Sequence, residues 1–275
     1  MDAKKKEKLK NIAKNMRINI IRMLAEAGSG HPGGSLSIVE ILTYLFIEKI
    51  KRTKENALAD DRDRFVLSKG HAVPALYAVL AEVGVIEEKE LLTIRKLGSP
   101  LQGHPDRVKF PYVEASTGSL GQGLSIAMGM ALASRLKRKK YKVYCIIGDG
   151  EFQEGQIWEA LLSAPKFKID NLIVFMDYNK FQLDNRVDKL MPLEPVKDKI
   201  KAFNWDVYEI DGHNYDEIEN VLNNLKNNGK PKFIIAHTIK GKGVSFMENN
   251  NEWHGVAPTK QEAEKALKEL MVTKT

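Results

Sequence analysis

The sequence predicts an α/β fold: an open, mostly parallel sheet with helices on both faces. Four short runs of apolar residues, at 142–147, 171–176, 206–210 and 232–237, are typical of strands that are covered on both sides. Helical segments separate the runs, which is the alternation of a parallel sheet with right-handed crossovers. Glycine or short polar residues follow each run, at the edge where parallel sheets bind ligands.

The part of the chain before these strands is predicted to be mainly helical. Apolar residues recur every three or four positions over 9–24, which predicts an amphipathic helix that ends at the glycine-rich loop 28–34. The next helix is expected to open with Ser37, because Glu40 follows it at capping-box spacing.

Three more helices are predicted from the same periodicity. Apolar helical patterns cover 72–83 and 126–136, and the loop 98–106 lies between them. The last helix is expected to begin at Thr259, with Glu262 at capping-box spacing, and to continue to about Met271.

The composition is that of a globular protein. The chain has 275 residues, of which 43% are hydrophobic and 29% charged, and it contains no convincing repeat or linker, so we expect one α/β domain over 1–275. No apolar run approaches the roughly 20 residues that span a bilayer. The N-terminus lacks the apolar core of a signal peptide, so we expect a cytoplasmic protein. The single cysteine, Cys145, excludes an internal disulfide and is expected in the core.

The net charge of +7 does not predict a nucleic-acid partner. The positive charges are spread among 36 acidic residues, and the densest basic run, 135–142, joins a predicted helix to a predicted strand. We expect no binding to nucleic acid or membrane, whereas a positive surplus suits phosphorylated ligands.

Oxygen ligands follow two of the predicted strands. Asp149 and Asn179 are expected at the ends of neighbouring strands, where hard oxygen donors suit Mg²⁺ or Ca²⁺. Gly148 and Gly150 would let the backbone approach a diphosphate without a Cβ in the way. Alone, the Gly-Asp-Gly triplet is better explained as a simple turn with an N-capping aspartate.

The spacing from this triplet to the asparagine resembles the thiamine diphosphate-binding motif. Six further segments, SGHPGGSLS, LSKGHA, GHPD, STGSLGQGLS, KGKGVSFME and WHG, occur in the order found in transketolases. Over 11–258 the chain resembles the N-terminal, thiamine diphosphate-binding domain of transketolase. The resemblance implies the thiamine diphosphate-binding fold and that cofactor.

Carried over by position, the resemblance implies a set of cofactor and metal contacts. Asp149 and Asn179 correspond to metal ligands, with the carbonyl of Phe181 as a third, and Gly148 and Gly150 flank the diphosphate. Two further residues, Gly118 and Leu120, correspond to those that touch the cofactor rings.

The resemblance also implies catalytic roles for four histidines and one acid. His71 and His254 correspond to histidines near the diphosphate and thiazolium, whereas His31 and His104 correspond to histidines on the substrate side. Taken singly, each would be read as an ordinary loop histidine, and their spacings match no zinc site. Glu154 corresponds to an acid that reaches across a subunit interface. His213 and His237 receive no role.

The chain departs from the family in two respects. The resemblance ends before the pyrimidine-binding and C-terminal domains, and no residue here corresponds to the glutamate that activates the cofactor. We therefore expect the N-terminal subunit of a split transketolase, inactive alone, that pairs with a second chain in a complex of two copies of each and acts on sugar phosphates. Tyr178 stands where the motif commonly has a second asparagine.

Other functions remain open at this stage. Deoxyxylulose-phosphate synthase and the α subunit of a 2-oxo acid dehydrogenase contain similar domains, although the segments quoted above fit transketolase better. A non-catalytic binding domain derived from such an enzyme is a third interpretation. A nicotinamide-binding protein is disfavoured, because the glycines of GSLGQG have the wrong spacing and no strand precedes them.

Overall fold

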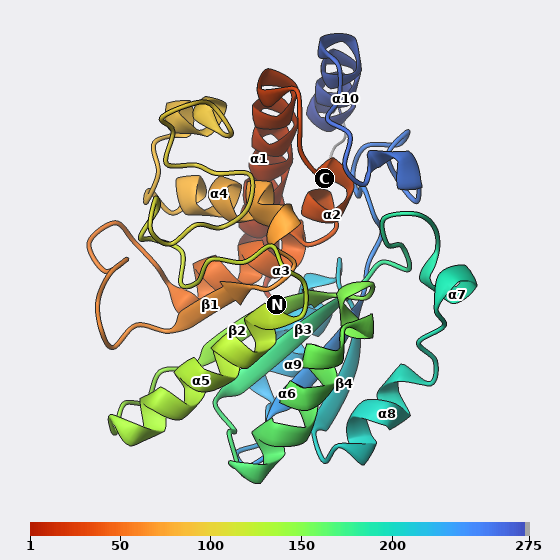
Figure 1. The fold of residues 1–275 in the computed structure, drawn as a ribbon. Helices are drawn as coiled ribbons and strands as arrows, with labels where there is room; N and C mark the ends of the chain where they lie inside the picture. Colours follow the sequence, from red (N-terminus) through yellow and green to blue (C-terminus); the bar gives the residue numbers. More distant parts are fainter. Residues whose placement is uncertain (273–275) are drawn as a thin grey trace.

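A five-stranded parallel sheet forms the centre of the molecule in the computed structural model, which describes residues 1–272 (Figure 1). The strand order is β1-β2-β3-β5-β4, and all four neighbouring pairs are parallel. The strands are β1 (Arg64–Leu67), β2 (Val143–Gly148), β3 (Leu172–Tyr178), β4 (Asp206–Asp211) and β5 (Lys232–His237).

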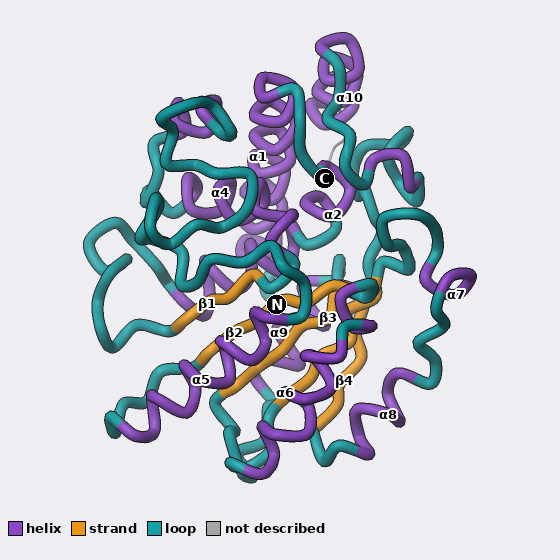
Figure 2. Tube along the Cα trace, in the orientation of Figure 1, coloured by secondary structure: helices purple, strands orange, loops and turns teal. Residues whose placement is uncertain are grey.

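Helices cover both faces of this sheet, as predicted (Figure 2). Consecutive strand residues point to opposite faces, so Tyr144 and Ile146 join one hydrophobic cluster while Cys145 and Ile147 join the other. The first cluster includes residues of α1 (Ala3–Ala27), α3 (Val39–Tyr44), α4 (Val73–Glu82), α9 (Tyr215–Asn223) and α10 (Lys260–Val272). The second includes residues of α5 (Gln122–Leu136), α6 (Gly155–Lys166), α7 (Val187–Leu190) and α8 (Val196–Ala202).

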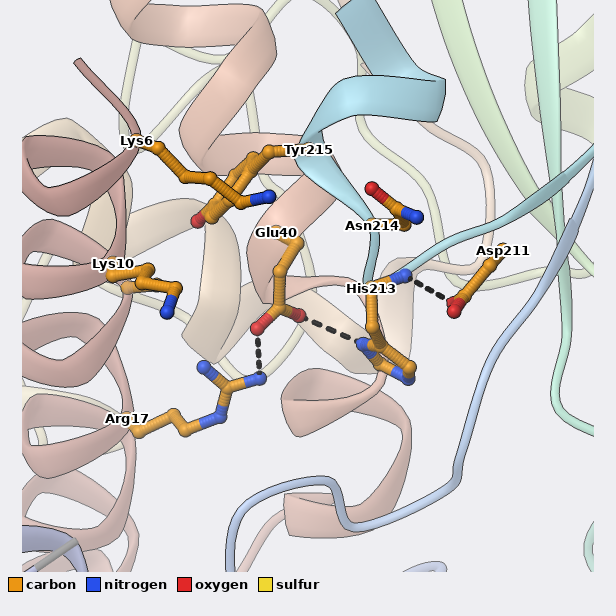
Figure 3. A pocket seen from close by; sticks show the side chains of 9 residues that line it. Lys6, Lys10, Arg17, Glu40, Asp211, His213, Asn214 and Tyr215 are labelled. Carbon is orange, nitrogen blue, oxygen red and sulfur yellow. Dashed lines mark hydrogen bonds and ion pairs between the residues drawn. The ribbon is translucent and has the colours of Figure 1, made fainter. Parts of the chain in front are cut away.

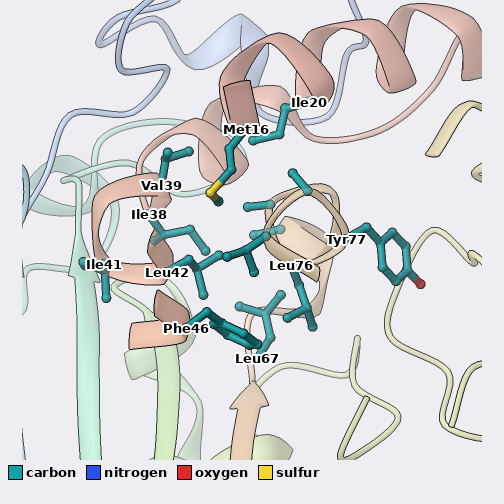
Figure 4. Close-up of a cluster of buried hydrophobic side chains, with 14 of the residues drawn as sticks. Met16, Ile20, Ile38, Val39, Ile41, Leu42, Phe46, Leu67, Leu76 and Tyr77 are labelled. Carbon is teal, nitrogen blue, oxygen red and sulfur yellow. The ribbon is translucent and has the colours of Figure 1, made fainter. Parts of the chain in front are cut away.

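The long helix α1 anchors the first cluster. Its N-terminus is capped by Asp2, whose Oδ1 accepts from Lys5 N at 2.8 Å, and it ends at Gly28, whose φ of 64° suits glycine. Its apolar stripe packs against α3 and α4. Figure 4 shows the surrounding cluster of buried side chains, which includes Met16, Ile20, Ile38, Val39, Ile41, Leu42, Phe46, Leu67, Leu76 and Tyr77.

The predicted start of the second helix is wrong. The segment predicted as a loop contains a short helix, α2 (Pro32–Leu36), and α3 begins only at Val39. Ser37 does not form a capping box, because its hydroxyl contacts Gly34 O and Asp177 Oδ2. Glu40 is instead paired with Arg17. Tertiary contacts with the sheet therefore override the local capping signal.

Two strand predictions also need correction. The four-residue strand β1 was not predicted, since it is too short to show a periodic pattern. β4 was expected to be covered on both sides, but it is the edge strand and only Ile210 is buried in it.

The capping box at the last helix is confirmed, because Thr259 N donates to Glu262 Oε2 at 2.8 Å and Glu262 N donates to Thr259 Oγ1 at 3.3 Å.

The chain order places a change of direction between β3 and β5. The connections from β1 to β3 run one way across the sheet, and the connection from β4 to β5 runs back. After β3 the chain continues to α7 and α8 on one face of the sheet, and after β5 it continues to α10 on the other, so the two loops diverge at neighbouring strands, as at a ligand-binding edge of an open parallel sheet. Within residues 1–272, no helix has both the length and the apolar character that a membrane crossing requires.

Candidate cofactor-binding and active site

A cleft of about 380 Å³ lies at the carboxyl ends of β2 and β3. Every site residue predicted from the sequence lines it, although the individual roles stay predictions. They are His31, His71, His104, Gly118, Leu120, Gly148, Asp149, Gly150, Glu154, Asn179, Phe181 and His254. Segments that are more than 200 residues apart in the chain thus meet at one edge of the sheet.

Asp149 is a buried carboxylate whose hydrogen-bond donors, within residues 1–272, are both backbone amides. Its Oδ1 accepts from Gly150 N at 2.7 Å, and its Oδ2 accepts from Lys180 N at 2.6 Å. Burial and the neighbouring Asp177 raise the pKa of Asp149 to about 7. A cation beside this carboxylate would therefore be stabilising. A Cβ on Gly150 would lie 2.7 Å from Gln182 Cβ, so glycine is required here.

Asn179 lies beside Asp149 at the end of the adjacent strand, as predicted. Its Nδ2 donates to Asp177 Oδ2 at 2.9 Å, and its Oδ1 accepts from Phe181 N at 3.1 Å. Tyr178 does not take the place of Asn179 in the cleft. Its hydroxyl donates to Glu194 Oε1 at 2.6 Å, and its ring packs in the second hydrophobic cluster, with residues of α5 to α8. The departure at Tyr178 thus leaves the asparagine in place.

These oxygen donors fit a small divalent cation. No group of three His, Cys, Asp or Glu side chains in the described chain forms a metal site. The donors here are instead one carboxylate, of Asp149, and one amide, of Asn179, which would suit Mg²⁺ because that ion is commonly completed by phosphate oxygens and water.

A buried ion pair supports the centre of the cleft and was missed by the sequence analysis. The Lys69 ammonium contacts Asp177 Oδ2 and donates to Gly34 O at 2.9 Å. Asp177 also accepts hydrogen bonds from Ser37 and Thr238. Burial alone would raise the pKa of Asp177, but Lys69 and the hydroxyl donors outweigh it and lower that pKa.

Lys240 is the second buried lysine of the cleft. In the part of the chain that the structure describes, its Nζ donates to three neutral acceptors: His254 Nδ1 at 2.8 Å, Asn251 Oδ1 at 2.9 Å and Gln182 O at 3.4 Å. Burial and repulsion from Lys69 lower the pKa of Lys240 to about 8. Both lysines belong to motifs quoted above, LSKGHA and KGKG, but the burial of a lysine cannot be predicted from its sequence context.

Glu151 is a further buried residue that the sequence analysis did not single out. Its Oε1 contacts Ser68 and accepts from Gly121 N at 2.9 Å, while its Oε2 accepts from Gly148 N at 3.0 Å. It therefore ties the loop after β2 to the start of α5. Burial raises the pKa of Glu151.

The four predicted histidines form one cluster. The ring centroid of His31 lies 5.2 Å from that of His71, 5.9 Å from that of His104 and 5.8 Å from that of His254. The rings of His71 and His254 are 5.3 Å apart. The Nδ1 of His31 is buried and has no hydrogen-bond partner within residues 1–272, so one polar atom of the cluster is left unsatisfied.

These imidazoles are neutral at neutral pH. Burial, with positive neighbours such as Arg95 and Lys240, lowers the pKa of His31 to about 4 and that of His254 to about 3. Burial likewise lowers the pKa of His71 and of His104. Because an ammonium can only donate, Lys240 leaves Nδ1 of His254 as an acceptor and places the proton of the neutral ring on Nε2.

The histidine cluster predicts acid sensitivity. Unfolded histidines bind protons below about pH 6.5, whereas folded His31 and His254 resist protonation down to about pH 4 and 3. The stability that they confer is complete above pH 6.5 and is lost as the pH falls through the folded values. We expect the free energy of unfolding of His254→Gln, measured with urea, to fall less steeply from pH 6.5 to 4 than that of the wild type. The exposed control His237→Gln should follow the wild type, and equal slopes would contradict the prediction.

Gly118 and Glu154 frame the opening of the cleft. Gly118 has a φ of 149°, and a Cβ there would lie 3.1 Å from His104 Cδ2, so its backbone can pass close to that ring. Glu154 is exposed and precedes α6, and its Cβ lies close to Gly121. Leu120 is half-buried beside them.

His213 and His237 are not among the residues that line the cleft. His237 contacts Glu209 on the edge strand at 2.8 Å, and its side chain is 43% exposed. His213 is more deeply placed, with 12% of its side chain exposed, and contacts Glu40 at 2.9 Å.

Comparison with known proteins agrees with this geometry. Residues 8–273 match the family model described as "Transketolase, thiamine diphosphate binding domain". The chain is 45% identical over 258 residues to the 6-deoxy-6-sulfo-D-fructose transketolase subunit SqwG of Clostridium sp. (strain MSTE9), which covers 92% of this chain and 94% of that protein. It is 39% identical to an apulose-4-phosphate transketolase subunit of Phocaeicola vulgatus, over 92% of this chain and 90% of that protein.

Longer transketolases match over part of their length. The human transketolase is 39% identical over 270 residues, and the match covers 98% of this chain but 43% of the human protein. The crystal structure of Campylobacter jejuni transketolase superposes with a TM-score of 0.88 at 32% identity, again over 98% of this chain and 43% of that chain. The fold, the cleft and these matches lead to one conclusion: the chain belongs to the transketolase family and corresponds to its thiamine diphosphate-binding domain.

Proposed function

We propose that this chain is the N-terminal subunit of a split transketolase, which transfers a two-carbon ketol unit from a ketose phosphate to an aldose phosphate. The observation that carries the proposal is a pair of unbalanced buried charges in one cleft. Asp149 accepts from two backbone amides, and burial and Asp177 raise its pKa. Lys240 donates to three neutral acceptors, and burial and repulsion from Lys69 lower its pKa. A divalent cation bound to a diphosphate supplies both missing partners.

The proposed cofactor is thiamine diphosphate with Mg²⁺, or alternatively Ca²⁺. Asp149, Asn179 and the Phe181 carbonyl would hold the metal, and Gly148 and Gly150 would admit the phosphates. Gly118, Leu120, His71 and His254 line the same cleft and would face the rest of the cofactor. The cofactor, when bound, supplies the carbanion chemistry, while the protein orients it and handles protons.

The histidines of this chain are proposed to hold and move protons at the sugar oxygens. Ketose cleavage creates and removes charge on those oxygens, so neutral rings that can donate or accept are suited to the task. His254 would donate from Nε2, because Lys240 occupies its Nδ1. His31, His71 and His104 lie within the same cluster, and burial keeps them unprotonated until a substrate proton reaches them.

The remaining parts of the enzyme are proposed to lie on a second chain. This chain covers nearly all of two relatives that are named as transketolase subunits, yet less than half of the human and Campylobacter proteins. We propose that the pyrimidine-binding and C-terminal domains are supplied by a partner in a cytoplasmic complex of two copies of each chain. Exposed Glu154 at the cleft opening would meet that partner.

Native mass spectrometry of the protein isolated from its source tests the proposal. We expect two copies of this chain, two of a second chain and bound thiamine diphosphate. The purified complex should transfer a ketol unit from xylulose 5-phosphate, whereas this chain alone should not. Use of pyruvate in place of xylulose 5-phosphate would favour a deoxyxylulose-phosphate synthase or a 2-oxo acid dehydrogenase. Failure of the complex to bind the cofactor would favour a non-catalytic binding domain.

A further inference from the structure

A second cavity, of about 470 Å³, lies between α1, α3 and the loop that follows β4. Figure 3 shows that Arg17, Glu40 and His213 point toward one another along its wall. None of the three lines the cleft described above. Their contacts nevertheless lead to a segment that does.

The three side chains form a continuous chain of hydrogen bonds. Arg17 Nη2 donates to Glu40 Oε1 at 2.6 Å, and Glu40 Oε2 lies 2.9 Å from His213 Nδ1. Although burial opposes it, Arg17 and His213 lower the pKa of Glu40 to about 2. The carboxylate is therefore charged and accepts from both neighbours.

The two ends of this series of hydrogen bonds, His213 and Arg17, both bind the backbone of the loop 239–243. Ile239 N donates to His213 Nε2 at 2.9 Å, and Arg17 Nε donates to Lys242 O at 2.9 Å. Since Nε2 of His213 accepts, the proton of the neutral ring lies on Nδ1, where it can be donated to Glu40.

The loop held in this way carries Lys240. Two backbone contacts flank this lysine, one on each side, and Gly241 N adds a third by donating to Gly33 O at 3.0 Å. Gly241 has a φ of 78°, and a Cβ there would lie 2.2 Å from Met247 O, so the loop conformation is tightly defined. At its centre, Lys240 donates to Nδ1 of His254 at 2.8 Å.

We propose that Arg17, Glu40 and His213 are positioning residues that hold the loop 239–243 so that Lys240 stays on Nδ1 of His254. They thereby keep the proton of His254 on Nε2 without touching the cleft themselves. The inference rests on the proposed function only in that His254 belongs to the proposed site. His237, at the end of the neighbouring strand β5, contacts the side chain of Glu209 instead of a loop amide and serves as a matched control.

Three variants of the full chain test this assignment without cofactor or substrate. His213→Leu removes the acceptor for Ile239 N and the donor to Glu40, His213→Gln retains one acceptor and one donor, and His237→Leu is the control. Hydrogen exchange reports the loop amides, and ¹⁵N shifts of the side-chain nitrogens of the six histidines report the tautomer of His254. Urea unfolding measures global stability in parallel.

We expect exchange at Ile239 to rise about tenfold or more in His213→Leu, the order expected when a buried acceptor is removed. The His254 nitrogens should change from the signature of one tautomer to that of a mixture. His213→Gln and His237→Leu should keep the wild-type loop exchange and tautomer. A lower stability in His213→Leu with an unchanged His254 tautomer would overturn the proposal, because it would indicate a purely structural role.

A conservative variant covers the case in which His213→Leu does not fold. Glu40→Gln keeps the size of the side chain but removes its charge. Loss of the single His254 tautomer in this variant would support the proposal, whereas an unchanged tautomer would overturn the proposal. Neither readout needs thiamine diphosphate, so failure of the cofactor to bind would count against the proposed function alone.

Discussion

Replacement of Asp149 by alanine is expected to abolish Mg²⁺-dependent binding of thiamine diphosphate to the assembled enzyme. The carboxylate is the one charged donor of the proposed metal site, and Asn179 and the Phe181 carbonyl cannot replace its charge. We expect the affinity to fall by more than about 100-fold, because loss of groups that merely support metal ligands already costs about 10- to 100-fold. Isothermal titration calorimetry with Mg²⁺ and the cofactor measures this change.

The pH dependence of the same titration provides an independent check. Since the pKa of Asp149 is raised to about 7, the metal must displace a proton below that pH, and its affinity should rise as the pH increases through about 7. Asp188→Ala, which removes a carboxylate that is 60% exposed on α7, is the control and should behave as the wild type. Unchanged cofactor affinity in Asp149→Ala would remove the metal assignment.

Replacement of Lys69 by methionine is expected to destabilise the chain strongly. The side chains of Lys69 and Asp177 are 2% and 0% exposed, so the variant leaves an uncompensated carboxylate in the interior. Breaking a buried pair in this way costs about 3–5 kcal/mol. Urea unfolding of the cofactor-free chain measures the loss. The control is Lys89→Met, which breaks an exposed ion pair with Glu87. Because the Lys89 side chain is 80% exposed, this variant should change the stability little.

Two further measurements separate charge from packing. Lys69→Met/Asp177→Asn should be less destabilised than the sum of the two single variants, because the double variant buries no charge. Without Lys69, burial should raise the pKa of Asp177, so the folded variant should take up a proton and its deficit relative to the wild type should shrink as the pH falls. A deficit that is independent of pH would indicate lost packing instead.

Four of the five strands and the pairing of Asp149 with Asn179 could be predicted from the residue pattern for a physical reason, whereas the other predicted site residues came from the resemblance to transketolase. Buried parallel strands consist of continuous apolar runs in the sequence. Because the loops at the carboxyl ends of neighbouring strands lie close together, Asp149 and Asn179 could be paired from the residue pattern alone. The edge strand β4 escaped this logic. Its apolar residues Val207, Tyr208 and Ile210 resemble those of a covered strand, although the burial of a strand depends on what lies beside it.

The charges that complete the site could not be predicted from the sequence. Lys69 and Lys240 are buried because segments distant in the chain close over them, and a lysine in a glycine-rich loop is otherwise exposed. The Ser37–Glu40 capping box failed for the same reason, since both side chains found distant partners in Asp177 and Arg17. Local signals held where no competing partner was near, as at Thr259.

The alternation along β3 has a consequence for how this chain can change during evolution. Ile173 and Phe175 face one cluster and Val174 and Met176 the other, and the same strand ends in Asp177 and Tyr178. One residue inserted before position 173 would exchange the two sets of apolar side chains and turn the carboxylate of Asp177 away from Lys69 at the same time. The register of β3 therefore fixes the packing of the core and the position of Asp177 together. We therefore expect insertions to be tolerated in the loops and not within β3.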